Sequence, residues 1–120
     1  MTENSTDSAA GFTDLVERIT VLHNIAEWSE RTRDIEAVAG LPRFTDEKSW
    51  AAFDQLSVGD ETRLPAWCLL ARAPDLGRVI VRAAELGWAA GAPVLGAHET
   101  RVVLTAPSGL VVVAYSPLRR

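Results

Sequence analysis

The feature that most constrains this chain is a helical unit between strand-like segments that occurs twice. In the first copy, apolar residues recur at Trp28, Ile35 and Ala39, and Thr32 lies in the same stripe. Spacings of four and three residues place these side chains on one face of a helix. Gly40 follows the last of them and is a residue type that commonly ends a helix. The pattern therefore predicts a helix that ends before Gly40.

A second helix is expected from Asp75 to Leu86, about 48 residues further along the chain. Its apolar stripe consists of Leu76, Val79, Ile80, Ala83 and Leu86. Asp75 is a residue type that caps the free amides of a first helical turn, and Gly87 is a helix-stop signal. A unit that returns at a fixed interval predicts two copies of one supersecondary motif.

Segments rich in apolar and β-branched residues predict strands around both helices. They cover residues 16–25 and 50–58 in the first copy, and 63–72, 90–96, 100–105 and 110–115 in the second. The last strand carries no charge on either face, whereas a strand with one solvated face alternates apolar and polar residues. A helix layer on one face, with a pocket or a dimer interface on the other, would explain it.

Composition excludes several classes of protein. The 120-residue chain has a net charge of -4, which disfavours a duplex nucleic-acid binder. No apolar run of about 18 residues is present, so we expect no membrane span. The polar, acidic start is unlike a signal peptide, which makes a cytoplasmic location the expectation. We expect a disordered tail over residues 1–11 and one domain over residues 12–120, with modules at about 15–66 and 67–117.

Four short motifs stand out, two at the ends of the expected helices and two around the last strands of the second copy. They are Ala39-Gly40-Leu41-Pro42, Glu85-Leu86-Gly87-Trp88, Gly96-Ala97-His98-Glu99 and Ala106-Pro107-Ser108-Gly109. Their order and spacing, from about Leu15 to Pro117, resemble the vicinal oxygen chelate superfamily of glyoxalase and bleomycin-resistance-like proteins. The resemblance implies an α+β fold. Two βαβββ-type modules would form a curved mixed sheet, shaped as a cup, with the helices on its convex face.

The resemblance also indicates where the ligands of a metal site would lie in this sequence. Metal-dependent members hold a divalent ion with His, Gln or Glu side chains, and the matching positions here are Thr20, Cys68 and Val113. A fourth position falls near Leu64, where no acid is found. Valine has no donor atom, and a thiolate with a hydroxyl is a weak ligand set. The resemblance therefore implies a member without metal ligands and without a cofactor.

Aromatic residues on the expected strands indicate a binding function. Trp50, Trp67 and Tyr115 can each stack on a planar ligand. The expected ligand-binding residues are these three together with Cys68, Val113 and Thr20, which face the cup by resemblance. The favoured function is metal-independent binding of a planar or apolar organic molecule. By resemblance, the protein would be a homodimer.

An enzyme on the same fold is the alternative. His23 is a candidate general base because histidine titrates near neutral pH, although a strand histidine bonded to backbone is the favoured interpretation. Asp54 interrupts an apolar run, and lies either on the solvent face, which is favoured, or buried with a raised pKa. With either base the reaction would be an isomerisation, dehydration or cyclisation. A metal-dependent lyase or dioxygenase is a further alternative. Another is a structural or regulatory protein that binds no ligand, in which side chains would fill the cup.

Two points about the first strand and the cysteine stay open. Either Val21, His23 and Ile25 line the cup, or the residues of the opposite parity, including Thr20 and Asn24, do so. Cys68 is a candidate nucleophile, but no neighbouring feature promises to lower its pKa, and an inert buried thiol is the favoured interpretation.

Overall fold

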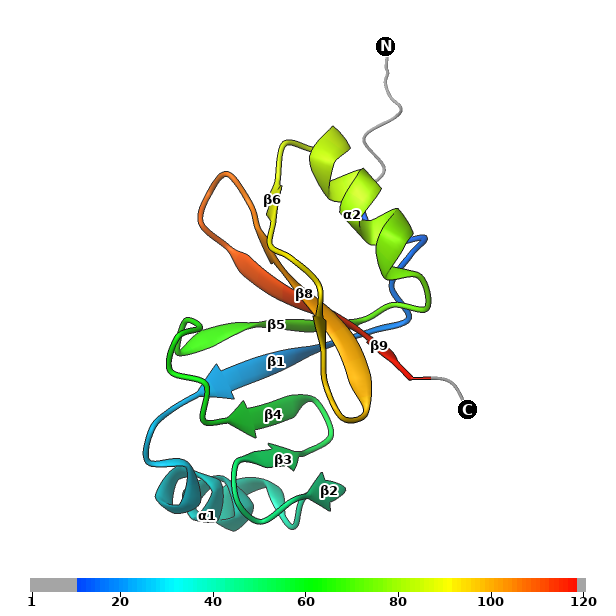
Figure 1. The fold of residues 1–120 in the computed structure, drawn as a ribbon. Coiled ribbons are helices and arrows are strands. Elements are labelled where there is room, and N and C mark those ends of the chain that lie inside the picture. Colours follow the sequence, from blue (N-terminus) through cyan, green and yellow to red (C-terminus); the bar gives the residue numbers. More distant parts are fainter. Residues whose placement is uncertain (1–10, 119–120) are drawn as a thin grey trace. The chain divides into compact units, whose positions relative to one another are not determined.

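The computed structural model describes residues 11–118, and its elements group into two units. The α1 unit is Thr20–Leu69, and the α2 unit comprises the described residues up to Ile19 and from Leu70 onward. The colours of Figure 1 follow the chain through both units. The tail expected over residues 1–11 lies outside the described residues, apart from Gly11.

The α1 unit is a mixed sheet with one helix. β1 (Arg18–Asn24) leads into α1 (Trp28–Ala39), and β2 (Phe44–Thr45), β3 (Trp50–Ala52) and β4 (Leu56–Gly59) follow. β3 pairs antiparallel with β2 and with β4, whereas β4 runs parallel to β1, so the strand order is β2-β3-β4-β1. The unit also contains the first residues of β5 (Trp67–Arg72). The first module therefore has its full set of strands.

Helix α1 packs through the apolar stripe that its sequence predicts. Trp28 is 6% exposed, and its indole Nε1 donates a 2.8 Å hydrogen bond to the carbonyl of Val58 on β4. The buried cluster consists of Trp28, Ala51, Phe53 and Val58, with Ile25, Ile35 and Leu56 packed against it. Gly40 ends the helix at a φ of 89°, a conformation that glycine adopts without a steric penalty.

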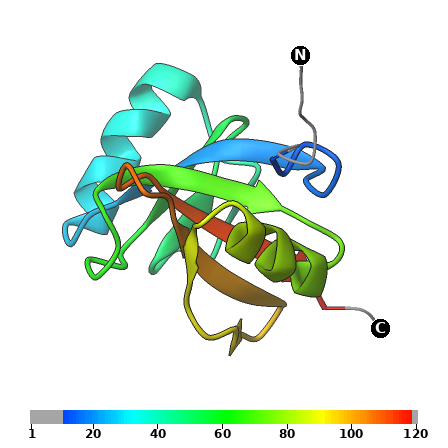
Figure 2. The ribbon, with the colours of Figure 1, turned by 90° about the horizontal axis from the view of Figure 1, so that it is seen from above.

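The α2 unit places a second helix on a long hairpin. α2 (Leu76–Glu85) precedes β6 (Ala89–Ala90), β7 (Val94–Leu95), β8 (Glu99–Thr105) and β9 (Val111–Pro117). β8 pairs antiparallel with β9 over seven residue pairs, and β6 and β7 both pair antiparallel with β8. Figure 2 shows α2 running along this hairpin.

The core of the α2 unit is apolar and lies between α2 and the hairpin. The Asp75 side chain caps the helix by accepting from the backbone N–H of Arg78 at 3.2 Å. The buried cluster consists of Leu15, Ala73, Val79, Ala83, Val102, Leu104 and Ala114, with Phe12, Leu76, Ile80, Trp88 and Val112 packed against it. Val112 and Ala114 are alternate residues of β9. One face of the charge-free strand is therefore covered by α2.

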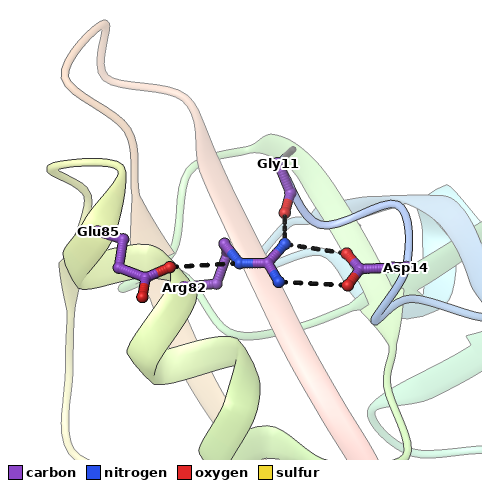
Figure 3. Close-up of polar contacts among 4 residues, drawn as sticks. All are labelled: Gly11, Asp14, Arg82 and Glu85. Carbon is purple, nitrogen blue, oxygen red and sulfur yellow. Dashed lines mark hydrogen bonds and ion pairs between the residues drawn. The ribbon is translucent and has the colours of Figure 1, made fainter. Parts of the chain in front are cut away.

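A polar cluster attaches the segment before β1 to α2 (Figure 3). The Arg82 guanidinium donates to both carboxylate oxygens of Asp14, at 2.9 and 3.2 Å, and also to the carbonyl of Gly11. Glu85 Oε1 lies 3.5 Å from Arg82 Nε on the other side. The hydrogen bond from Arg82 lowers the pKa of Asp14 below its ordinary value. This two-pronged contact orients the chain where it enters the fold.

Both helices are confirmed, but two expected strands are wrong. The strand expected over residues 50–58 is a hairpin of β3 and β4, closed by a 2.7 Å hydrogen bond from Phe53 N–H to the Leu56 carbonyl. The strand expected over residues 90–96 is two short strands, β6 and β7, on either side of Pro93. Proline has no N–H for a sheet ladder, so pairing is interrupted there.

The observed class is α+β, as the resemblance implies. Each unit has one helix on one face of strands that are paired within that unit. Neither helix among residues 11–118 has the length and apolar character required to cross a bilayer.

Candidate functional site

The strands of the α1 unit have two faces, and their pairing assigns residues to each. His23, Val58 and Ala51 are register partners on β1, β4 and β3. Val58 and Ala51 pack with Trp28 of α1, so this row lies on the helix face. Because side chains alternate along a strand, the next residue on each strand points to the opposite face. We call that opposite side the far face.

The far face carries a row of three register partners, Asn24, Gly59 and Trp50. The glycine lets its neighbours approach each other. A Cβ built on Gly59 would lie 3.2 Å from Asn24 Oδ1 and 3.2 and 3.3 Å from two carbon atoms of the Trp50 ring. These contacts are tighter than most real Cβ contacts, so a side chain at this position would require the amide or the indole to shift by a few tenths of an ångström.

The Asn24 amide is fixed by the chain between β4 and β5. Its Nδ2 donates to the Pro65 carbonyl at 2.9 Å and lies 3.8 Å from the Cys68 Sγ. The backbone N–H of Asn24 donates to the Ala66 carbonyl at 2.8 Å. Asn24 is 5% exposed, and no described residue donates a hydrogen bond to its Oδ1. The far face therefore contains a buried acceptor without a partner in the described chain.

Cys68 lies beside this amide and is 4% exposed. Burial raises the pKa of its thiol above the ordinary value, and the contact with Asn24 opposes that shift without reversing it. A protonated thiol is a weaker nucleophile and a weaker metal ligand than the thiolate, which is the reactive form. Cys68 is thus an apolar neighbour of Asn24 with little nucleophilic character at neutral pH.

The loop before β3 holds the backbone of Trp50 in place. Asp46 Oδ1 accepts from the backbone N–H groups of Lys48, Ser49 and Trp50 at 2.8–2.9 Å. The Thr45 hydroxyl donates to the Trp50 carbonyl at 2.8 Å. The amide hydrogen bonds hold the pKa of Asp46 well below its ordinary range. Trp50, half-buried, therefore projects from a hydrogen-bonded turn and not from a free loop.

Three solved structures share this arrangement of elements. An NAD-dependent benzaldehyde dehydrogenase from Legionella pneumophila is 10% identical, with a TM-score of 0.72 over 84% of this chain and 100% of that one. Methylmalonyl-CoA epimerase from Mycobacterium tuberculosis is 12% identical, with a TM-score of 0.57 over 94% of both chains. A glyoxalase/bleomycin resistance protein/dioxygenase superfamily member from Vibrio splendidus 12B01 is 12% identical, with a TM-score of 0.52 over 84% of this chain and 98% of that one.

The chain has the glyoxalase/bleomycin resistance protein/dioxygenase fold. No protein-family model and no curated protein matches its sequence. At identities of 10–12% the likeness extends to the fold and carries no activity to this chain.

The residues present do not fit the metal centre known in some proteins of this fold. Of the three matched positions, Val113 is 0% exposed and has no donor atom, and burial raises the pKa of the Cys68 thiol, which makes the metal-binding thiolate more costly to form. Thr20 supplies only a hydroxyl. Among residues 11–118, no group of three or more His, Cys, Asp or Glu side chains could hold an ion. This donor set does not supply the ligands that divalent cations require.

His23 lies on the helix face, where both of its ring nitrogens have partners. Its Nδ1 is 2.7 Å from the Ala66 carbonyl, which can only accept, and its Nε2 is 2.6 Å from Arg31 Nη1, which can only donate. Nδ1 therefore carries the proton, and the lone pair of Nε2 is occupied. The Trp67 ring stacks on the imidazole, with centroids 3.9 Å apart and planes at 19°. Trp67 thus covers His23 and is itself 59% exposed.

The remaining expected site residues are dispersed. Asp54 lies in the β3–β4 turn, with its side chain 86% exposed and 3.5 Å from Arg43, which matches the solvent-face interpretation. Tyr115 and Val113 lie in the α2 unit, on the face of β9 opposite to Val112 and Ala114. Thr20 has the parity of Asn24 on β1 and so belongs to the far face.

The structure thus places Trp50 and Cys68 near Asn24 on the far face, places Thr20 further along β1 on the same face, and places Trp67 with His23 on the helix face. Asn24, which the sequence placed in the cup in only one of two open registers, and Gly59 are far-face residues that were not among the expected ligand-binding residues. An asparagine within an apolar, β-branched strand was a signal for the first of them, because such a side chain needs hydrogen-bond partners when buried. The role of Gly59 depends on its pairing with Asn24 and Trp50, which its place at the end of an apolar run does not reveal.

Proposed function

We propose that this protein binds a small, planar organic molecule on the far face of the α1 unit, without a metal ion and without breaking a bond in it. The observation that carries the proposal is the half-buried Trp50 indole on the same face as Asn24, Gly59 and Cys68. Binding sites for small molecules combine apolar and aromatic surface with a few fixed polar groups. The far face has that composition.

The geometry supports stacking of a ligand on Trp50. Its backbone is held by Asp46 and Thr45, so ligand binding does not have to order the main chain at this position. Ala52, half-buried in the next row of the far face, adds apolar surface. Aromatic stacking and apolar burial would together supply the affinity.

The candidate catalytic residues favour binding over chemistry. His23 would have to give up its contact with Arg31 before Nε2 could take a proton, and it lies on the helix face. Asp54 lies at a surface turn beside Arg43. The thiol of Cys68 has a raised pKa. An isomerase, dehydratase or cyclase that uses His23 or Asp54 remains the alternative, and a homodimer in the cytoplasm remains the expected setting.

The test is equilibrium dialysis against a panel of planar aromatic compounds, with protein treated with EDTA and protein left untreated. We expect saturable one-to-one binding that EDTA leaves unchanged. Trp50→Ala should weaken it by about tenfold or more, since about 1.4 kcal/mol corresponds to a factor of ten in affinity. Trp67→Ala, on the helix face, and Trp88→Phe, in the α2 unit, are the matched controls and should bind normally.

Two results would contradict the proposal. A ligand lost in Trp67→Ala but retained in Trp50→Ala would bind on the helix face instead. Turnover of any bound compound, abolished by His23→Ala or Asp54→Ala with binding retained, would establish the enzymatic alternative.

A further inference from the structure

We infer that Asn24 Oδ1 is the specificity-determining acceptor of the far face, and that the ligand class is planar aromatic compounds with an O–H or N–H donor at the ring edge. This inference rests on the proposed function, because it names which ligands the same face selects. It adds a directional requirement to a site that stacking alone would leave tolerant of any flat molecule.

The orientation of the Asn24 amide is determined by its surroundings. One end of the amide lies 2.9 Å from the Pro65 carbonyl, which can only accept a hydrogen bond. That end must therefore be the Nδ2 donor, and a flipped amide would bring two oxygens together. Oδ1 is consequently the end that points over Gly59, where a Cβ would lie 3.2 Å from it.

Oδ1 is buried and has no donor among the described residues. Asn24 as a whole is 5% exposed. Buried polar atoms in folded proteins nearly always have a hydrogen-bond partner, and an unpartnered one needs an explanation. A donor supplied by a ligand explains why an asparagine is present here, with its Nδ2 bonded to the Pro65 carbonyl and its Oδ1 available to accept.

The position of Oδ1 also determines where the ligand carries its donor. Oδ1 and the Trp50 ring border the same position, since both are about 3.2 Å from the site of a Gly59 Cβ. A molecule that stacks on Trp50 therefore lies next to a position that Oδ1 also borders. A donor attached directly to the ring reaches the acceptor once the indole edge moves aside, whereas a ring without a donor leaves the acceptor unpaired.

Selection of this kind is strong because it is asymmetric. A site that hydrogen-bonds a ligand rejects the analogue that lacks the donor, since the buried acceptor then stays unpaired. The probes should therefore differ only at the donor. A suitable pair is 2-naphthol and 2-methoxynaphthalene, which have the same ring system, with the donor blocked by a methyl group in the second.

The experiment measures the dissociation constants of both probes by equilibrium dialysis for the wild-type protein, Asn24→Leu and Thr32→Val. We expect the wild type to prefer 2-naphthol by about tenfold or more, and Asn24→Leu to bind the two probes within about a factor of two of each other. Thr32→Val is the matched control. It removes the other buried oxygen without a partner among residues 11–118, which belongs to α1, and should keep the wild-type preference.

The outcomes separate the two proposals, and the wild-type comparison alone suffices if Asn24→Leu does not fold. Equal affinities of the wild type for both probes would overturn the inference, would assign Oδ1 to a buried water, and would leave the proposed binding function intact. A tenfold preference that persists in Asn24→Leu would overturn it as well. Failure of both probes to bind the wild type, together with failure of the whole aromatic panel, would overturn the proposed function and the inference with it.

Discussion

The two units bury different kinds of side chain. The core of the α2 unit consists only of apolar residues, from Leu15 to Ala114. The α1 unit contains all four buried polar residues of the described chain, which are His23, Asn24, Thr32 and Ser57. Apolar burial stabilises without any requirement for direction, whereas each buried polar group needs a partner. Apolar burial therefore accounts for the core of the α2 unit, whereas the α1 unit buries polar side chains that a need for stability alone does not explain.

The two helices show the same difference. Asp75 caps α2 with its side chain, and Val79 and Ala83 are the buried residues of that helix. Glu27 makes no such cap on α1, and the residues that α1 buries are Trp28 and Thr32. Helix α1 is thus held through an indole hydrogen bond as well as through apolar packing, and its stability depends more on the strands of its own unit.

The largest expected effect is on the apolar core of the α2 unit. Leu104→Ala removes a side chain that is 1% exposed, and should lower the free energy of unfolding by about 2–5 kcal/mol through lost burial and the cavity left behind. Urea denaturation measures it. Val81→Ala, on the same unit's helix but 59% exposed, is the control and should change stability by less than about 0.5 kcal/mol. Equal losses of stability in Leu104→Ala and Val81→Ala would show that the apolar core does not stabilise the α2 unit more than its surface does.

A smaller effect is expected where the α1 unit depends on a polar contact. Trp28→Phe keeps an aromatic ring but removes the 2.8 Å hydrogen bond to the buried Val58 carbonyl. We expect a loss of about 1–3 kcal/mol, the cost of an unpaired buried acceptor together with some lost packing. Denaturation with urea measures it, and Trp88→Phe in the α2 unit should be milder. Unchanged stability in Trp28→Phe would show that α1 is held by apolar packing alone.

One substitution should raise stability. Thr32 Oγ1 is buried without a partner among the described residues, so Thr32→Val replaces a hydroxyl by a methyl group of similar size. We expect a gain of about 1 kcal/mol. The matched change in the other unit, Ala83→Ser, introduces a hydroxyl at a position that is 0% exposed and should destabilise. Thermal unfolding of both variants measures this, and a loss of stability in Thr32→Val would mean that the hydroxyl has a water partner.

The smallest expected effect concerns pH. The pKa of Asp46 is lower in the folded protein than its unfolded value of about 3.9, because three backbone amides stabilise the carboxylate. Its contribution is therefore complete above about pH 5 and is lost as the pH falls below about 4 toward the folded pKa. The stability difference between the wild type and Asp46→Asn should shrink over that range in urea titrations. A difference that grows on acidification would contradict the depressed pKa.

The helices and the general order of strands were predictable because local signals determine them. The stripe from Trp28 to Ala39, the Asp75 cap and the stop glycines act over a few residues, and the structure has helices at both places. The turn within residues 50–58 was not predictable from apolar content, since Phe53 continues the apolar run. The antiparallel pairing of β3 with β4 and the hydrogen bond from Phe53 to Leu56 show the reversal. Pro93 itself was a signal for the break between β6 and β7, but the apolar residues around it favoured one continuous strand.

The sequence by itself determined the two helices and the two-fold repeat of the helical unit, whereas the α+β class and the absence of a donor atom at matched positions such as Val113 followed from the resemblance to a known superfamily. The helices and their repeat depend on periodicities of a few residues, and the resemblance depends on the order and spacing of the four motifs. Only the tertiary structure decided which parity of β1 faces α1, because a strand apolar on both faces has two equivalent registers until it pairs. That pairing placed His23 under Trp67 and Arg31, and placed Asn24 with Gly59 and Trp50. The candidate site is thus a property of strand register, which the long-range contacts of the fold determine.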